Sequence, residues 1–362
     1  MTARADLATS LKLEPAAPTK TFVLEVHTDD PATYLDDLFG PGAVSGTSDA
    51  FLHRAQLDGG EMWVDQLDSR FWSFHTDMPV QPAKRFLHHR VQRSRDLDWL
   101  WLPSDHLLRV SKNAPARRLR TDFAGGALRG SDAAGAGLKL QATGRRAEKL
   151  LEYLAGSPEY RGTLSLDAIH VAVDDGLGGV MNEAVDQRGV FAASGDSLET
   201  HFQFVRSVVG RYAYLVELLE AKAIGWNSLE NGGGTLDGGP IGIQFSEPVT
   251  DLVRFVDMLF TSKEPFRLWG VPRITDEGVA EVDAVDLHVG QRLRIDIGPG
   301  WMRVYLERDS CGNTVARLIT NLQHSFDSRL SLSDPDLQQA LTAGSDTLDG
   351  PPTTLASSTM RL

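Results

Sequence analysis

The chain has 362 residues and a formal net charge of −13, and 41% of its residues are hydrophobic, which is typical of a globular protein with more than one domain. It contains no run of about 18 apolar residues, no apolar core of a secretory signal near its start, and a single cysteine, Cys311. These features exclude a membrane-spanning helix, an internal disulfide framework and a cysteine-rich zinc site, and they predict a cytoplasmic protein. Arginine far outnumbers lysine, which indicates a GC-rich bacterial source.

Charge is unevenly distributed along the chain. Residues 84–149 contain 15 Lys and Arg against 6 Asp and Glu, whereas the remainder contains 21 against 43. A net negative charge argues against general, sequence-independent binding of nucleic acid. The basic segment therefore either faces acidic groups of the same chain, which we favour, or binds an anionic partner such as nucleic acid.

The first section, residues 21–124, has the pattern of an N-terminal α+β domain that follows a disordered leader over residues 1–20. A strand over residues 21–27 precedes a helix whose N-terminal cap is Asp29 or Asp30. The other elements predicted here are a hairpin over residues 59–76 and a helix over residues 81–95.

The middle section, residues 125–222, predicts α+β structure that ends in a long helix. Its earlier elements are a short helix over residues 145–156 and strands over residues 167–175, 180–186 and 189–194. Apolar residues then recur at spacings of four and three, which predicts an amphipathic helix of about six turns. These residues are Leu198, Phe202, Val205, Val209, Tyr212, Val216 and Leu219.

The remaining sections are a Gly-rich linker over residues 223–240, a C-terminal α+β domain over residues 241–330 and a disordered tail over residues 331–362. The C-terminal domain is predicted to begin with a strand and a helix capped by Ser246, followed by several strands. The last two strands form a hairpin over residues 291–307, and residues 314–322 form a further strand or a short helix.

The first and last sections share the order strand, capped helix and aromatic-rich hairpin. Their hairpins align without gaps around Asp65 and Asp296, which predicts a weak internal repeat between the N- and C-terminal sections. The whole sequence predicts an α+β fold of antiparallel sheets, each backed by one or two helices, in two or three domains.

The block Gly195-Asp196-Ser197-Leu198 lies between a predicted strand and the long helix. It resembles the nucleophile motif of the GDSL esterase/lipase family, and this resemblance implies a hydrolase with Ser197 as nucleophile. That family also has a Gly-x-Asn-Asp block and a late Asp-x-x-His, and neither follows here. A serine without a base and an oriented acid is a weak nucleophile. We therefore favour a helix cap, in which Asp196 accepts backbone N–H bonds and Glu199 reaches back.

Asp286 and His288 lie two residues apart on a predicted strand, so their side chains share a face and could act as metal ligands or as an acid–base pair. No third ligand is apparent from the spacing, and a structural hydrogen bond is favoured. Cys311 lies in a turn-like stretch and is predicted to be inert or exposed. The sequence thus predicts no catalytic set, no metal ligands and no cofactor.

The C-terminal hairpin has an arginine–aromatic face, which is typical of protein interface hot spots and of base-stacking surfaces. The residues of this face are Arg292, Arg294, Trp301, Arg303 and Tyr305. Packing of the face against the middle section is an equally weighted alternative. Three basic residues of the helix over residues 81–95, namely Lys84, Arg85 and Arg93, offer a second binding surface.

The sequence therefore predicts a non-enzymatic binding or assembly protein that holds a protein or an anionic partner, including a second copy of the chain. Two alternatives stay open. One is a hydrolase with Ser197 or the pair Asp286 and His288 in its site. The other is a nucleic-acid-binding protein that uses residues 84–149.

Overall fold

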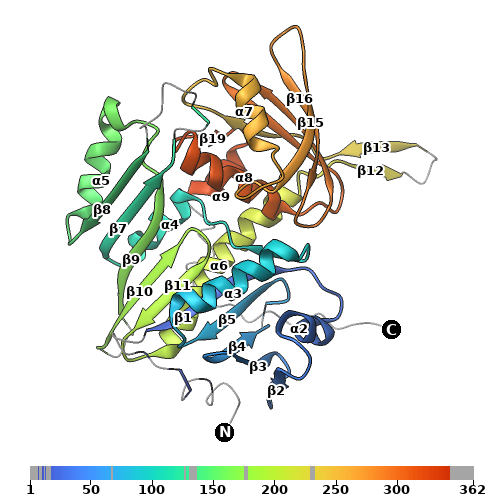
Figure 1. Ribbon diagram of the computed structural model, residues 1–362. Helices are drawn as coiled ribbons and strands as arrows, with labels where there is room; N and C mark the ends of the chain where they lie inside the picture. Colours follow the sequence, from blue (N-terminus) through green and yellow to red (C-terminus); the bar gives the residue numbers. More distant parts are fainter. Residues whose placement is uncertain are drawn as a thin grey trace.

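In the residues that the structure describes, the fold has two main sheets with helices packed around them and a separate two-stranded sheet (Figure 1). The computed structural model describes residues 7, 10–11, 13, 18–66, 68–125, 128–129, 137–174, 178–228 and 233–342. Its helices and antiparallel strands confirm the predicted α+β class. No helix in these ranges is both long and apolar enough to cross a membrane.

The large sheet has eleven strands in the order β2-β3-β4-β5-β1-β11-β10-β9-β7-β8, and β6 pairs with β1 outside this row. Its strands are β1 (Thr19–Val26), β2 (Val44–Gly46), β3 (Leu52–Leu57), β4 (Gly60–Asp65), β5 (Phe71–Thr76), β6 (Leu97–Trp99), β7 (Ala116–Phe123), β8 (Leu138–Thr143), β9 (Leu166–Asp174), β10 (Val180–Asp186) and β11 (Val190–Ser194). Because β1 pairs with both β5 and β11, strands of the first and middle sections belong to one sheet.

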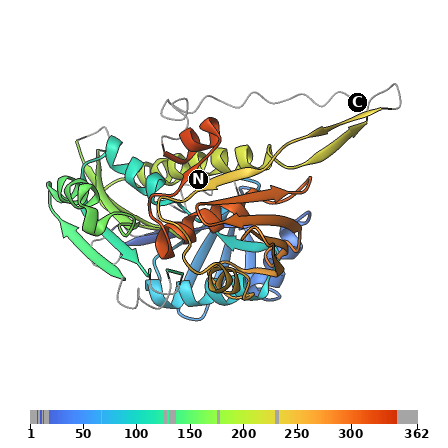
Figure 2. The same ribbon diagram turned by 90° about the horizontal axis from the view of Figure 1, so that it is seen from above.

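The small sheet has six strands in the order β15-β16-β17-β18-β14-β19. These strands are β14 (Ile241–Gln244), β15 (Leu268–Ile274), β16 (Ala280–Asp286), β17 (Arg292–Gly298), β18 (Trp301–Leu306) and β19 (Ser331–Leu332). Where the sequence predicts a linker, β12 (Gly225–Ser228) and β13 (Gly234–Asp237) form a two-stranded hairpin. Figure 2 shows this hairpin projecting away from both sheets.

The two ends of the fold share one topology. Strand β1 is followed by helix α2 (Pro31–Phe39) and by a four-stranded meander whose last strand, β5, pairs with β1. Strand β14 is followed in the same way by α7 (Leu252–Leu259) and by a meander whose last strand, β18, pairs with β14. This shared order supports the predicted repeat between the N- and C-terminal sections.

Both repeat helices begin at an aspartate. Asp30 accepts the backbone N–H of Thr33 at 3.2 Å, as one of the two predicted caps. Asp251 accepts the corresponding N–H in α7 at 3.0 Å, so the predicted cap Ser246 is wrong. Ser246 instead lies before this helix and donates its hydroxyl to Asp327 at 2.7 Å.

The long helix α6 (Leu198–Glu220) confirms the periodic signal, and its predicted apolar stripe is buried. Its N-cap is Ser197, one residue after the predicted Asp196. The Ser197 hydroxyl accepts the backbone N–H of Thr200 at 3.2 Å. The other helices are α3 (Val80–Arg93), α4 (Ser104–Asn113), α5 (Ala147–Gly156), a 3-10 turn (Pro158–Tyr160), α8 (Gly312–Ser325) and α9 (Pro335–Thr342).

The chain ends differ from the predicted disorder wherever the structure describes them. Helix α9 lies within the predicted tail, because the spacing of Leu337, Ala340 and Leu341 gives it an apolar side, and all three are buried. In the predicted leader, Leu7 and Leu11 are buried in one apolar cluster with α6 residues. The rest of the leader up to residue 17, apart from residues 10 and 13, and residues 343–362 lie outside the described residues.

Candidate metal centre between the two repeats

A polar cavity of about 1080 Å³ opens where the two repeats meet, beside the N-terminus of α8. Residues from both repeats line it, together with the end of α6. Among the lining residues are His27, Arg70, Asp96, Glu220, Ser310 and Cys311.

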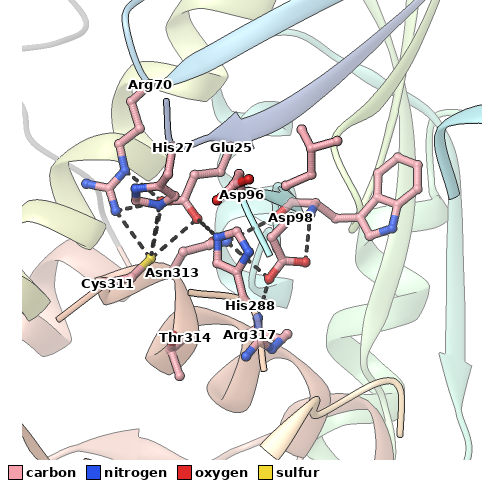
Figure 3. A network of polar contacts seen from close by, with 12 residues as sticks. Glu25, His27, Arg70, Asp96, Asp98, His288, Cys311, Asn313, Thr314 and Arg317 are labelled. Atoms are coloured by element: carbon pink, nitrogen blue, oxygen red, sulfur yellow. Dashed lines mark hydrogen bonds and ion pairs between the residues drawn. The ribbon is translucent and has the colours of Figure 1, made fainter. Parts of the chain in front are cut away.

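Four metal-ligand side chains converge at the floor of this cavity. Glu25 and His27 come from the end of β1, His288 from the turn after β16, and Cys311 from the position before α8. One donor atom from each residue lies within 4.8 Å of the others. Figure 3 shows the four side chains pointing toward one another.

The contacts given between these donor groups are 3.0–3.6 Å long, with Glu25 using a different oxygen toward each histidine, and all four donors lie within 4.8 Å of one another. The Cys311 Sγ lies 3.4 Å from both carboxylate oxygens of Glu25 and 3.6 Å from His27 Nε2. Glu25 lies 3.3 Å from His27 Nε2 and 3.0 Å from His288 Nε2. Zinc bonds of about 2.0–2.3 Å at tetrahedral angles place neighbouring ligand atoms roughly 3.3–3.6 Å apart.

The local structure positions these four residues. Glu25 and His27 are two positions apart, so the strand geometry directs both to the same side. The Cys311 backbone N–H donates to Gln291 Oε1 at 2.8 Å. The His288 backbone N–H donates to Asp286 Oδ1 at 3.2 Å. Glu25 and His288 have no exposed surface, whereas the His27 side chain is 35% exposed toward the cavity.

Charge and burial act in opposite directions on the two acidic donors. Burial raises the pKa of Glu25, but hydrogen bonds from His27 and His288 and the positive charge of Arg70 outweigh it and hold that pKa well below its usual range. Burial raises the pKa of the Cys311 thiol well above its usual range, and the Glu25 carboxylate adds to this rise. These shifts favour a carboxylate on Glu25 beside a neutral thiol on Cys311.

Arg70 connects the donor cluster to α6 and α8. Its Nε donates to Glu25 at 2.6 Å, and its Nη2 lies 3.5 Å from the Cys311 sulfur. The other face of the guanidinium group binds Glu220 through two bonds of 2.6 and 3.0 Å. Glu220 also accepts the backbone N–H of Gly312 at 2.8 Å. Arg70 thus contacts and orients two of the donor residues, Glu25 and Cys311.

A buried ionic network lies beneath the site. Arg317 of α8 forms ion pairs with Asp98 on the large sheet and Asp286 on the small sheet, and all three side chains are almost fully buried. Thr314 donates to Asp286 at 2.6 Å. Asp286 and His288, which the sequence pairs, therefore have different partners. His288 belongs to the donor cluster, whereas Asp286 binds Arg317 and Thr314 of α8.

The other residues singled out in the sequence lie outside this cavity. Ser197 caps α6, and its hydroxyl bonds to Thr200. On β17 and β18, Arg292, Arg294 and Arg303 are exposed, whereas Trp301 and Tyr305 are partly buried. The Arg303 guanidinium lies over the Trp301 ring at 4.8 Å, and Arg294 binds Asp296 at 3.0 Å.

Some cations of the basic segment pair with carboxylates of the same chain. Lys84 lies 3.5 Å from Asp186, and Arg120 lies 2.8 Å from Asp167. On the same helix as Lys84, Arg85 lines a separate cavity with His89 and Arg90, and Arg93 is exposed.

Sequence reasoning missed three of the four donors. One available signal was the Glu-x-His pattern of Glu25 and His27 at the end of a predicted strand, because it places two possible metal ligands on one side of that strand. Cys311 was predicted to be inert or exposed; it is buried, at 4% exposure, within the cluster, so the exposed alternative is wrong.

Comparison with known proteins assigns the chain to a family. The model of the MJECL33-like protein family matches residues 4–341, so the chain belongs to that family. It is similar to an uncharacterized protein, MJECL33, of Methanocaldococcus jannaschii. The two are 25% identical over 370 residues, which cover 90% of this chain and 89% of the relative.

Proposed function

We propose that this chain is a metal-dependent hydrolase whose ion is held by Glu25, His27, His288 and Cys311. The observation that carries the proposal is the convergence of these four donors, within 4.8 Å, on a polar cavity. One thiolate, two imidazoles and one carboxylate suit zinc better than magnesium or calcium, which prefer oxygen ligands. The hydrolase alternative from the sequence named Ser197 or the pair Asp286 and His288. Of these residues, only His288 belongs to the proposed site, and Ser197 caps α6.

An ion of this class would supply Lewis acidity and would lower the pKa of a bound water to about 7. Because four protein donors fill a tetrahedral sphere, that water would occupy a fifth coordination position. The chain's own residues determine access to it. His27 and Cys311 line the cavity, so a water or a substrate oxygen approaches from that side. Glu25 and His288 close the opposite side because both are buried.

Cobalt substitution tests the proposal. The wild-type chain should bind one equivalent of Co²⁺ and show a thiolate-to-cobalt charge-transfer band. Cys311→Ser should abolish that band, and His288→Gln should weaken binding at least about tenfold. His89→Gln is the matched control, because His89 is an exposed histidine outside the cavity. Equal spectra and affinities for wild type, Cys311→Ser and His288→Gln would contradict the proposal.

A second candidate function rests on the arginine–aromatic face of β17 and β18, which we infer to be a protein-binding surface. Its arginines are exposed, and the Arg303–Trp301 stack matches the residue types of interface hot spots. A protein retained by the wild type and by Arg273→Ala, but lost by Trp301→Ala, would support it. Equal retention by all three would count against it. A bacterial source and a cytoplasmic location remain parts of this proposal.

A further inference from the structure

A second cavity, of about 710 Å³, is lined by the end of α2, the turn between β3 and β4, and one side of α3. It shares no lining residue with the cavity beside the proposed metal centre. We call it the α3 cavity, because α3 supplies half of its lining residues, namely Pro82, Arg85, Phe86, His89 and Arg90. A volume of this size accommodates a small organic molecule.

The five α3 residues form one stripe of the helix. Their spacing is i, i+3, i+4, i+7 and i+8, which places them on a single side. The neighbouring stripe of Ala83, Leu87 and Val91 is buried in the core. The packing of α3 therefore leaves its other stripe at the cavity. Of the basic residues that the sequence singles out on this helix, Arg85 lines the cavity and Lys84 and Arg93 do not.

The α3 side of the cavity is rich in cationic side chains. Arg85, His89 and Arg90 belong to the lining, and Asp58 is its one acidic residue. Within the described ranges, the three α3 side chains form no ion pair. Lys84, by contrast, lies 3.5 Å from Asp186. The lining therefore has two guanidinium groups and an imidazole against one carboxylate.

Aromatic stacking positions one of these cations beside an apolar wall. The guanidinium carbon of Arg90 lies 5.2 Å from the centre of the Phe86 ring, which is a cation–π contact. Phe86 stacks on Phe39 of α2, with ring centres 5.5 Å apart. Phe39 and Met78 are buried, and Leu57 and Phe86 are half-buried. The α3 cavity thus combines a positioned guanidinium group with apolar surface.

We propose that the α3 cavity binds an amphipathic anion, that is, a carboxylate or phosphate joined to an apolar chain or ring. The acidic group accepts hydrogen bonds from Arg85, His89 and Arg90, and the apolar part packs on Phe86 and Phe39. Guanidinium groups bind carboxylate and phosphate oxygens through charge-assisted hydrogen bonds, which are about twice as strong as neutral ones. A polar anion leaves the apolar wall uncovered, and a neutral molecule leaves the cations unpaired. This site is independent of the proposed metal centre.

Calorimetric titration of the metal-free full chain with octanoate, octylammonium, 1-octanol and acetate tests this ligand class. Octanoate should bind at least about tenfold tighter than octanol or octylammonium, because only octanoate pairs with the guanidinium groups. Acetate should bind weakest, because it has no apolar chain to bury. Equal affinities for the three eight-carbon compounds, or no binding of octanoate, would overturn the proposal. Binding to phosphatidylglycerol vesicles without binding of free octanoate would instead indicate a membrane surface and would also overturn it.

Variants identify the residues responsible. Arg85→Gln combined with Arg90→Gln should remove most of the preference for octanoate over octanol. Arg93→Gln is the matched control and should keep it, because Arg93 is an exposed arginine of the same helix outside the lining. Thermal unfolding checks that each variant is folded. Arg85→Gln alone changes an exposed side chain and should reduce the preference about threefold. An unchanged preference in Arg85→Gln, or an equal loss in Arg93→Gln, would contradict the assignment.

Discussion

Cys311 shows how much the role of one residue depends on distant neighbours. In the sequence it is a lone cysteine in a turn. In the fold it precedes α8 and lies 3.4 Å from Glu25, which is 286 positions away in the chain. His288 is 263 positions from the same carboxylate. No local pattern records such separations, so the donor set could not be assembled from spacing alone.

Ser197 gives a residue-scale prediction. Because its hydroxyl accepts the Thr200 N–H, Ser197→Ala should lower the free energy of unfolding by about 1 kcal/mol. It should leave cobalt binding unchanged, since Ser197 does not line the metal cavity. Urea unfolding and cobalt titration measure the two effects. Asp196→Ala is the control and should cost less; a larger loss there would restore Asp196 as the cap.

At the scale of elements, α8 is the helix that joins the two sheets. Its β-branched residues left strand and helix both open in the sequence. Asn313, Arg317 and Asn321 are four residues apart and therefore lie on one side of a helix, and all three are buried. The spacing of these three polar residues was the sequence signal for a helix, and their burial is seen only in the structure. The strands of the C-terminal hairpin, by contrast, alternate clearly and were predicted correctly.

Arg317 carries a prediction about this helix. Arg317→Met removes the cation between Asp98 and Asp286, which leaves Asp286 without its ion pair and Asp98 with only the 3.4 Å pair to Arg267. The free energy of unfolding should fall by about 3–5 kcal/mol in urea titrations. Arg273→Met, which removes an exposed pair with Glu281, should change it little. Similar losses for the two variants would contradict a structural role for the buried network.

His106 links α4 to α9 and gives a pH prediction. Its Nε2 bonds the Ala340 carbonyl at 2.8 Å, and burial lowers its pKa from 6.5 to about 4. Between these values the unfolded chain binds a proton that the folded chain does not. Stability should therefore fall as the pH drops through this window, by up to about 1.4 kcal/mol per pH unit from this group.

Urea titrations from neutral to mildly acidic pH measure this slope. His106→Gln should be less stable at neutral pH but should lose less stability on acidification than the wild type. His89→Gln, an exposed histidine, should keep the wild-type slope. An unchanged slope in His106→Gln would show that other groups dominate acid sensitivity.

At the scale of the whole molecule, local elements were largely predictable but their assembly was not. The sequence indicated most strands and the long helix α6. It did not indicate that β1 pairs with β11 as well as β5, which unites the first and middle sections in one sheet. Pairing between strands so far apart leaves no local pattern. The proposed metal centre likewise depends on long-range packing, because its donors come from the N- and C-terminal repeats.

Ion binding should therefore stabilise the whole chain. At a free Zn²⁺ concentration about 100 times the Kd, the free energy of unfolding should rise by about 2.7 kcal/mol. Thermal unfolding with zinc and with a chelator measures the difference. Cys311→Ser should show a much smaller rise. An equal rise in the variant would place the ion elsewhere.

X-ray absorption of the zinc-loaded chain examines the ligands themselves. We predict one sulfur at about 2.3 Å and nitrogen or oxygen ligands at about 2.0–2.2 Å around the ion, with the sulfur absent in Cys311→Ser. A wild-type spectrum with oxygen and nitrogen ligands but no sulfur would contradict a metal centre built on Glu25, His27, His288 and Cys311.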